Sequence, residues 1–375
     1  MTATSKQDWI DRLGSHATSI PATKILIVAN SLVFAAMLLA GAGLWHSPNG
    51  IQLEWGANFG PATKNGEWWR LGTAMFLHFG LLHLAMNMWA LWDGGRLVER
   101  LIGSGRFLLG YFAAGLTGNL LSLVTHGDQT VSGGASGAVF GVYGALLLLL
   151  WRQRRNLHPG EFRWLFWGAG AFTVASILFG LLVPGIDNAA HLGGFVAGTL
   201  ACAALVRPEA STASPMKQTP AAAAALLAGG IVALVTHIPE PAYRWNEEKA
   251  ARLEIREFMG EDAAISARWT QILEEARRQG LSFDQLAERI DAGVTGPYEQ
   301  SFEQLSGLNI DPRAPSAGTV QALRRYAELR RDSSVELADA LRRRNPQRIQ
   351  EALKAARQAK ATAESKPPAA APQQP

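Results

Sequence analysis

The sequence has little of the chemistry from which disulfide frameworks, metal sites and phosphate loops are made. Its single cysteine, Cys202, lies in an apolar run and can form no internal disulfide. We find no internal repeat, no glycine-rich phosphate loop and no ligand pair at zinc spacing. The sequence therefore predicts neither a bound metal ion nor a cofactor.

Charged residues are also scarce, at 18% of the 375 residues, and their distribution argues against a nucleic-acid partner. Residues 1–238 hold 14 Lys and Arg against 10 Asp and Glu, whereas residues 239–375 hold 21 of each. The net charge of +4 therefore belongs to the N-terminal part of the chain. There it lies in connections between apolar runs, where basic residues determine membrane topology.

Apolar runs, in contrast, are abundant before residue 239. A helix that spans a bilayer needs about 20 apolar residues, and seven runs approach or reach that length. They are residues 25–44, 81–97, 105–124, 136–151, 162–183, 189–206 and the Ala-rich 220–237. The sequence thus predicts an all-α polytopic membrane protein with a six-helix core, a seventh transmembrane helix and a helical soluble C-terminal region.

The predicted organisation has five segments. They are a cytosolic tail (1–23), the six-helix core (24–206), a connection with the seventh span (207–238), an extramembrane helical region (239–365) and a disordered tail (366–375). Residues 46–77 contain turn dipeptides and interfacial aromatics, and we expect a long non-helical connection there. In the soluble region, Gly260 and Gly280 are expected to interrupt helices, and Ser282 and Ser333 to open them with capping boxes.

The basic residues orient these spans. With the N-terminus in the cytosol, twelve Lys and Arg fall in cytosolic segments and only Lys64 and Arg70 in outer loops up to the sixth span. The second, fourth and sixth spans then all enter from the outer face. Their polar residues therefore share one shallow depth. Seven spans would place residues 239–375 outside the cytosol.

A glycine-rich stretch, residues 132–144, opens the fourth span. It places Ser136 at the start of the predicted helix, directly after Gly133 and Gly134, which can take φ > 0 and turn the chain tightly. Backbone N–H groups in the first turn of such a helix are free to bind a developing oxyanion. Taken alone, Ser136 could equally be one more small residue on a helix-packing face.

Glycines recur on one face of two predicted helices. Those that follow the serine are Gly137, Gly141 and Gly144, and those that follow His191 are Gly194 and Gly198. Faces without side chains allow helices to approach closely. We predict that these faces pack together and bring the His191 imidazole to the Ser136 hydroxyl. A nucleophile and a general base are the minimal pair for acyl transfer.

Two polar residues of the second span, His83 and Asn87, lie one turn apart on one face. Their side-chain N–H groups suit an oxyanion hole. A metal site made of His78, His83 and His191 is the alternative, but no carboxylate accompanies them at ligand spacing. The hydrolase elbow G-x-S-x-G is not matched, because Ala138 stands at its second glycine.

In these motifs the chain resembles the rhomboid family of intramembrane serine proteases. The matching residues are Trp69-Arg70, His78-(x4)-His83-(x3)-Asn87, Gly134-Ala135-Ser136-Gly137 and Ala190-His191-Leu192-Gly193-Gly194. The resemblance implies a six-helix core with the seventh helix appended, and it does not extend to residues 239–375. It also implies a catalytic dyad without an acidic third member.

The resemblance further implies roles for residues around the dyad of Ser136 and His191. An oxyanion hole would be formed by His83, Asn87 and the Ser136 N–H. His78 would support the loop above the oxyanion hole. Phe140 falls where many members carry an aromatic residue that packs on the catalytic histidine. Asn188, three residues before His191, matches a position seen in some members.

The sequence therefore predicts an intramembrane serine endopeptidase in a bacterial cytoplasmic membrane, with its active site toward the outer face. Its expected partners are transmembrane protein substrates and the lipid bilayer, and the sequence predicts no oligomeric state. One alternative is a catalytically inactive rhomboid-like protein that binds membrane clients. Another, a seven-helix transporter, would need ionisable residues along a path through the membrane. Here the polar residues converge at one depth instead.

Overall fold

A computed structural model describes residues 19–128, 130–206 and 219–365, which form two compact units. The first unit ends at Pro241 and the second begins at Ala242. Most of the predicted N-terminal tail, the connection at 207–218 and the predicted C-terminal tail at 366–375 lie outside the described residues.

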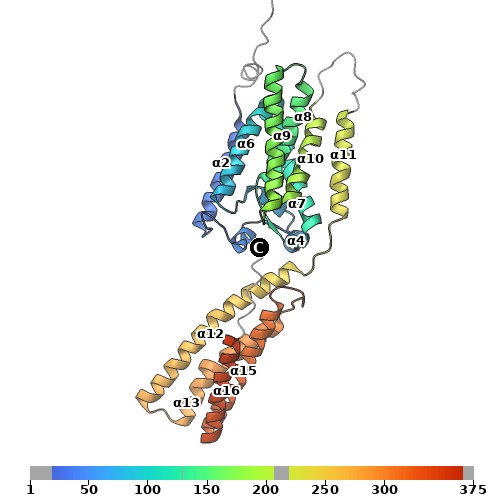
Figure 1. Cartoon of the computed structure of the whole chain (residues 1–375). Helices are drawn as coiled ribbons and strands as arrows, with labels where there is room; N and C mark the ends of the chain where they lie inside the picture. Colours follow the sequence, from blue (N-terminus) through green and yellow to red (C-terminus); the bar gives the residue numbers. More distant parts are fainter. Residues whose placement is uncertain (1–18, 129, 207–218, 366–375) are drawn as a thin grey trace, which may run out of the picture. The chain divides into compact units, whose positions relative to one another are not determined.

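The first unit is a bundle of apolar helices (Figure 1). Among the described residues, five helices are long and apolar enough to cross a bilayer: α2 (Pro21–Leu39), α7 (Ser104–His126), α8 (Ser136–Gln153), α9 (Pro159–Leu182) and α10 (Asn188–Leu205). Helix α6 (Leu81–Ile102) gives a sixth span when it is joined to Arg70–Phe76, from which it is bent by 93°. The predicted all-α polytopic membrane fold is confirmed.

Helix α11 (Thr219–Thr236) corresponds to the predicted seventh span and packs beside α10. Its apolar part, Pro220–Thr236, is shorter than the five spans. The first span is shifted relative to the prediction of residues 25–44, because α2 begins at Pro21 and ends at Leu39. Proline is favoured in the first turn of a helix, and Gly41 at φ +94° turns the chain after it.

The segment between α2 and α6 is not the non-helical connection that was predicted. It contains three short helices, a 3₁₀ turn and a strand: α3 (Asn49–Glu54), β1 (Asn58–Phe59), α4 (Gly60–Lys64), α5 (Arg70–Thr73) and η1 (Ala74–Phe76). Asn-Gly and Gly-Pro dipeptides are typical of turns, but Asn49-Gly50 and Gly60-Pro61 begin α3 and α4. Helix starts accept such residues because their first N–H groups need no partner within the helix.

Strand β1 pairs antiparallel with β2 (Val131–Ser132), so that Asn58 lies opposite Ser132 and Phe59 opposite Val131. This pairing joins the segment after α2 to the residues just before α8. The short sheet therefore holds the entry to the glycine-rich stretch.

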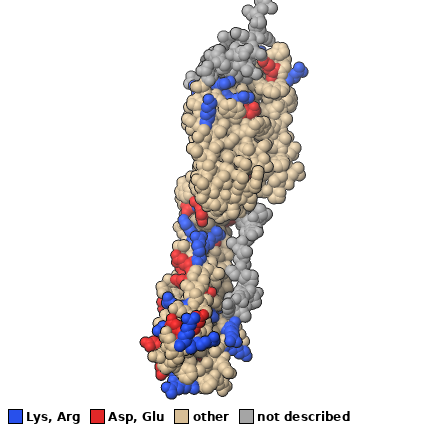
Figure 2. Space-filling view, turned by 90° about the vertical axis from the view of Figure 1, so that its left-hand side faces the viewer, with Lys and Arg blue, Asp and Glu red and all other residues tan. Residues whose placement is uncertain are grey.

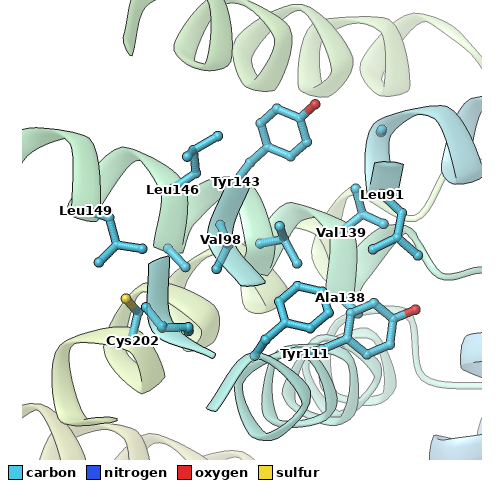
Figure 3. Close-up of a cluster of buried hydrophobic side chains, with 14 of the residues drawn as sticks. Leu91, Val98, Tyr111, Ala138, Val139, Tyr143, Leu146, Leu149 and Cys202 are labelled. Carbon is cyan, nitrogen blue, oxygen red and sulfur yellow. The ribbon is translucent and has the colours of Figure 1, made fainter. Parts of the chain in front are cut away.

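The core of the first unit is an apolar cluster between α6, α7, α8 and α10 (Figure 3). Leu91, Tyr111 and Leu150 are fully buried within it. Helix α8 is the most buried of the five spans and α9 the least. On the face shown in Figure 2, a broad band of the first unit carries no charged side chain, as a lipid-facing surface requires.

One buried charge within the first unit joins three helices. The Glu99 carboxylate accepts hydrogen bonds from Ala22 N (2.9 Å), Thr23 N (2.8 Å), Thr23 Oγ1 (2.6 Å) and Ser104 Oγ (2.7 Å). It thereby satisfies N–H groups in the first turn of α2, which have no partner within the helix. A buried carboxylate is tolerated only when hydrogen bonds of this kind replace its hydration.

The described residues of the second unit form only helices and their connections. They are α12 (Trp245–Gln279), α13 (Phe283–Ile290), the π-helix η3 (Asp291–Thr295), α14 (Gly296–Gly307), α15 (Ala317–Arg342) and α16 (Pro346–Ser365). Gly280 ends α12 in the left-handed conformation, and Ser282 opens α13 with a capping box, as predicted. Gly260 and Ser333, however, lie inside α12 and α15. An interior glycine costs a helix only about 1 kcal/mol, which tertiary packing can offset.

A polar cluster lies inside this unit. Asp262 Oδ1 accepts hydrogen bonds from the hydroxyls of Tyr298 (2.7 Å) and Tyr326 (3.0 Å). Burial raises the pKa of the Tyr298 hydroxyl, so it stays protonated and remains a donor. The cluster therefore ties α14 and α15 to α12.

Candidate active site

Ser136 is the first residue of α8, and the chain reaches it through a tight turn. Gly134 has φ +146°, and its N–H donates to the Ala74 carbonyl at 2.8 Å. Gly133, in contrast, does not have the positive φ that was predicted. It lies close to the segment before α6, because a Cβ on Gly133 would be 3.3 Å from Leu77 Cβ. Ser136 is half-buried, and its N–H belongs to the first helical turn, where it has no partner within the helix.

The glycine faces of α8 and α10 are in direct contact. A Cβ on Gly194 would lie 2.6 Å from the Gly137 carbonyl carbon, and one on Gly198 would lie 2.5 Å from the Gly141 carbonyl carbon. Gly144 extends the contact, because a Cβ there would meet the Phe195 carbonyl oxygen at 2.6 Å. Side chains of any size would hold the helices apart.

This close packing brings the two predicted catalytic residues together. His191 Nε2 and Ser136 Oγ are 2.9 Å apart, a hydrogen-bond distance. The His191 side chain is buried, with 6% of its surface exposed, and Phe140 stacks on its ring with 4.2 Å between centroids and 9° between planes. The stacked aromatic restricts rotation of the imidazole.

A chain of hydrogen bonds determines which imidazole nitrogen can act as a base. Asn188 Nδ2 donates to the Ile177 carbonyl of α9 at 3.2 Å, which leaves Asn188 Oδ1 facing His191 Nδ1 at 3.3 Å. An amide oxygen can only accept, so the Nδ1 nitrogen carries the proton. His191 Nε2 is then unprotonated and accepts the hydrogen bond from the Ser136 hydroxyl, as a general base requires.

Of the two predicted oxyanion donors on α6, His83 lies beside the serine. His83 Nδ1 accepts from the Phe79 N–H at 3.4 Å, so its proton lies on Nε2. A Cβ on Gly134 would lie 3.0 Å from His83 Nε2 and 3.5 Å from Ser136 Oγ, which places the His83 ring edge beside the nucleophile. Asn87 Nδ2 donates to the His83 carbonyl at 2.9 Å. This bond uses one of the two hydrogens of the Asn87 NH₂ group and leaves the second for an acceptor on a bound substrate.

The segment that precedes α6 is fixed by hydrogen bonds and a ring contact. The His78 ring packs edge-on against His83 at 5.0 Å between centroids, and its carbonyl accepts from Gln52 Nε2 at 3.0 Å. Arg70, 4% exposed, donates to the carbonyls of Leu53 (2.7 Å) and Ala57 (3.1 Å). These bonds hold the segment before α6 in place next to His83.

Asp187 was missed by the sequence analysis. Its carboxylate caps α10 by accepting from Ala190 N at 2.9 Å, and it also accepts from Ser122 Oγ (2.5 Å) and Ser132 Oγ (2.6 Å). An aspartate directly before an apolar helix is a helix-start signal that would have found the cap. The two serine contacts have no such signal.

The alternative prediction for His78, His83 and His191 was a metal site. Within residues 19–128, 130–206 and 219–365, no three His, Cys, Asp or Glu side chains are grouped as metal ligands would be. His78 and His83 contact each other through their rings.

The fold and this site define a polytopic helical membrane protein in which glycine-faced helices bring a serine and a histidine into hydrogen-bond contact. The family model "Rhomboid domain" matches residues 65–208. The chain is 43% identical over 158 residues to the rhomboid protease GluP of Bacillus subtilis, covering 42% of this chain and 30% of GluP. It is 38% identical over 145 residues to YdcA of the same organism, covering 39% of this chain and 70% of YdcA.

A third relative, rhomboid-type serine protease 2 of Emericella nidulans, is 36% identical over 136 residues, which are 35% of this chain and 26% of the relative. The chain belongs to the rhomboid family. It spans less than a third of the length of GluP and of the Emericella protein. The matched family domain includes α6 to α10 but neither α2 nor the second unit.

Proposed function

We propose that this chain is an intramembrane serine endopeptidase that hydrolyses peptide bonds in or near the transmembrane segments of membrane proteins. The observation that carries the proposal is the 2.9 Å contact between Ser136 Oγ and the unprotonated nitrogen of a histidine whose tautomer is set by Asn188. The names of the relatives, rhomboid protease and serine protease, support a hydrolase of this class.

In the proposed reaction Ser136 Oγ attacks the carbonyl carbon of the scissile bond, while His191 Nε2 takes the hydroxyl proton. The negative charge that develops on the carbonyl oxygen is stabilised by the Ser136 N–H, His83 Nε2–H and the Asn87 amide. Collapse of the tetrahedral intermediate breaks the C–N bond, and His191 returns the proton to the leaving amine. Water activated by the same histidine then hydrolyses the acyl-enzyme.

The depth of the site limits the substrates. A transmembrane helix has its backbone amides hydrogen-bonded internally, so the bond to be cleaved must first leave the helix. Segments with glycine, proline or polar residues near the outer boundary of the membrane unwind at the lowest cost. We propose that such segments are preferred, and that the protein lies in a bacterial cytoplasmic membrane with its N-terminus in the cytosol.

The test uses the purified full-length protein in proteoliposomes with a model transmembrane substrate and a fluorophosphonate probe. Ser136→Ala and His191→Ala are expected to abolish cleavage, and the double variant to be scarcely slower than either. Ser31→Ala is the matched control, because it removes a hydroxyl that donates to the Ile27 carbonyl within α2, a helix that carries none of the candidate site residues. Substrate capture without cleavage or probe labelling would instead favour a client-binding protein.

A further inference from the structure

One carboxylate joins the two segments that carry the dyad. Asp187 lies one helical turn before His191 and caps the helix that bears it, through the 2.9 Å bond from Ala190 N. The same carboxylate accepts from Ser132 Oγ at 2.6 Å, and Ser132 lies in β2, four residues before Ser136. It is therefore a direct link between the approach to the nucleophile and the start of the histidine helix.

The link is anchored to a third element. Ser122 Oγ of α7 donates to the same carboxylate oxygen at 2.5 Å, and His126 Nδ1 lies 3.7 Å from the other oxygen. The two serine bonds fall in the short range of O–H···O⁻ hydrogen bonds, which are about twice as strong as neutral ones. The Asp187 side chain is 10% exposed, so water competes little for it.

The carboxylate does not form a catalytic triad with the histidine. The Nδ1 nitrogen of His191 faces Asn188 Oδ1, and the hydrogen bonds of Asp187 go to Ala190 N and the two serines. Its hydrogen bonds therefore act on the reaction through the segments that they hold.

We propose that Asp187 is a positioning residue, whose carboxylate sets the separation of Ser136 and His191 by holding Ser132 and the N-terminus of α10 together. This inference rests on the proposed function. A displacement of about 1 Å at reacting groups can lower a rate on the order of 10²-fold. Loss of one of several anchors should cost less, and we expect roughly tenfold for Ser132→Ala.

The experiment measures the rate constant for fluorophosphonate labelling per folded molecule of the full-length protein, together with kcat and KM for a transmembrane substrate. Ser132→Ala and Asp187→Ala should lower the labelling rate constant and kcat roughly tenfold or more, with KM within about twofold. Asp187→Asn should recover most of the loss, because its amide oxygen can cap α10 and its NH₂ group can donate to both serine oxygens. Ser31→Ala again serves as the matched control.

A purely structural role would lower the yield or the Tm of the variants and leave the labelling rate constant per folded molecule unchanged. That result, or wild-type labelling by Ser132→Ala, would overturn the inference and leave the proposed function intact. A wild-type protein that neither reacts with the probe nor cleaves substrate would overturn both.

Discussion

The contact between the glycine faces of α8 and α10 makes Gly194→Ala a direct test of how the dyad is assembled. The new methyl carbon would lie 2.6 Å from the Gly137 carbonyl carbon and 3.1 Å from its Cα. Carbon atoms pack best at about 3.5–4.0 Å, so the helices must separate by about 1 Å. Such a shift stretches the 2.9 Å contact between Ser136 Oγ and His191 Nε2 to about 3.9 Å, beyond hydrogen-bond distance.

We therefore expect Gly194→Ala to lower the labelling rate of Ser136 and kcat on the order of 10²-fold. Overpacking should also lower the free energy of unfolding by about 1–3 kcal/mol. The assay is the time course of fluorophosphonate labelling in proteoliposomes, corrected for folded protein, with substrate cleavage measured in parallel.

The matched control is Gly170→Ala in α9, where an added Cβ would meet nothing within 4 Å. It makes the same chemical change in a membrane helix and should keep activity within about twofold, because alanine is the better helix former. Labelling of Gly194→Ala at the wild-type rate would refute the reasoning, since the dyad would then not depend on the close approach of the two helices.

Three further predictions concern other parts of the molecule. Asn87→Ala should slow hydrolysis by up to about 10²-fold without abolishing it, because the Ser136 N–H and His83 remain as donors; a wild-type kcat in purified enzyme would exclude Asn87 as a donor. Asp262→Ala leaves two tyrosine hydroxyls without their shared acceptor and should lower the free energy of unfolding of the second unit by about 2 kcal/mol, seen as faster limited proteolysis with unchanged Ser136 labelling. If α11 spans the membrane, a cysteine that replaces the exposed Gln279 should react with a membrane-impermeant maleimide in spheroplasts. Cys202 is 2% exposed and should stay unreactive. Reaction of the new cysteine only after lysis would place the second unit in the cytosol.

Local patterns were enough to predict the membrane fold and to single out Ser136 and His191, which the structure brings into contact. Apolar length identified the spans, because a segment surrounded by lipid must pair its backbone amides internally, as a helix does. Helical spacing placed glycines on the faces of α8 and α10 that carry Ser136 and His191, and the structure brings those faces into contact. The Ser282 capping box was also predictable, since both of its hydrogen bonds lie within four residues.

Only the tertiary structure decided the features that depend on residues far apart in the chain. The orientation of Asn188, and with it the tautomer of His191, is set by a carbonyl of α9. Asp187 accepts hydrogen bonds from Ser122 and Ser132, which lie more than 50 residues away in the chain. The short helices between α2 and α6 were missed because turn dipeptides also suit helix starts. Side-chain hydrogen bonds between distant segments leave no periodic pattern in a sequence, because they form only after the helices have packed.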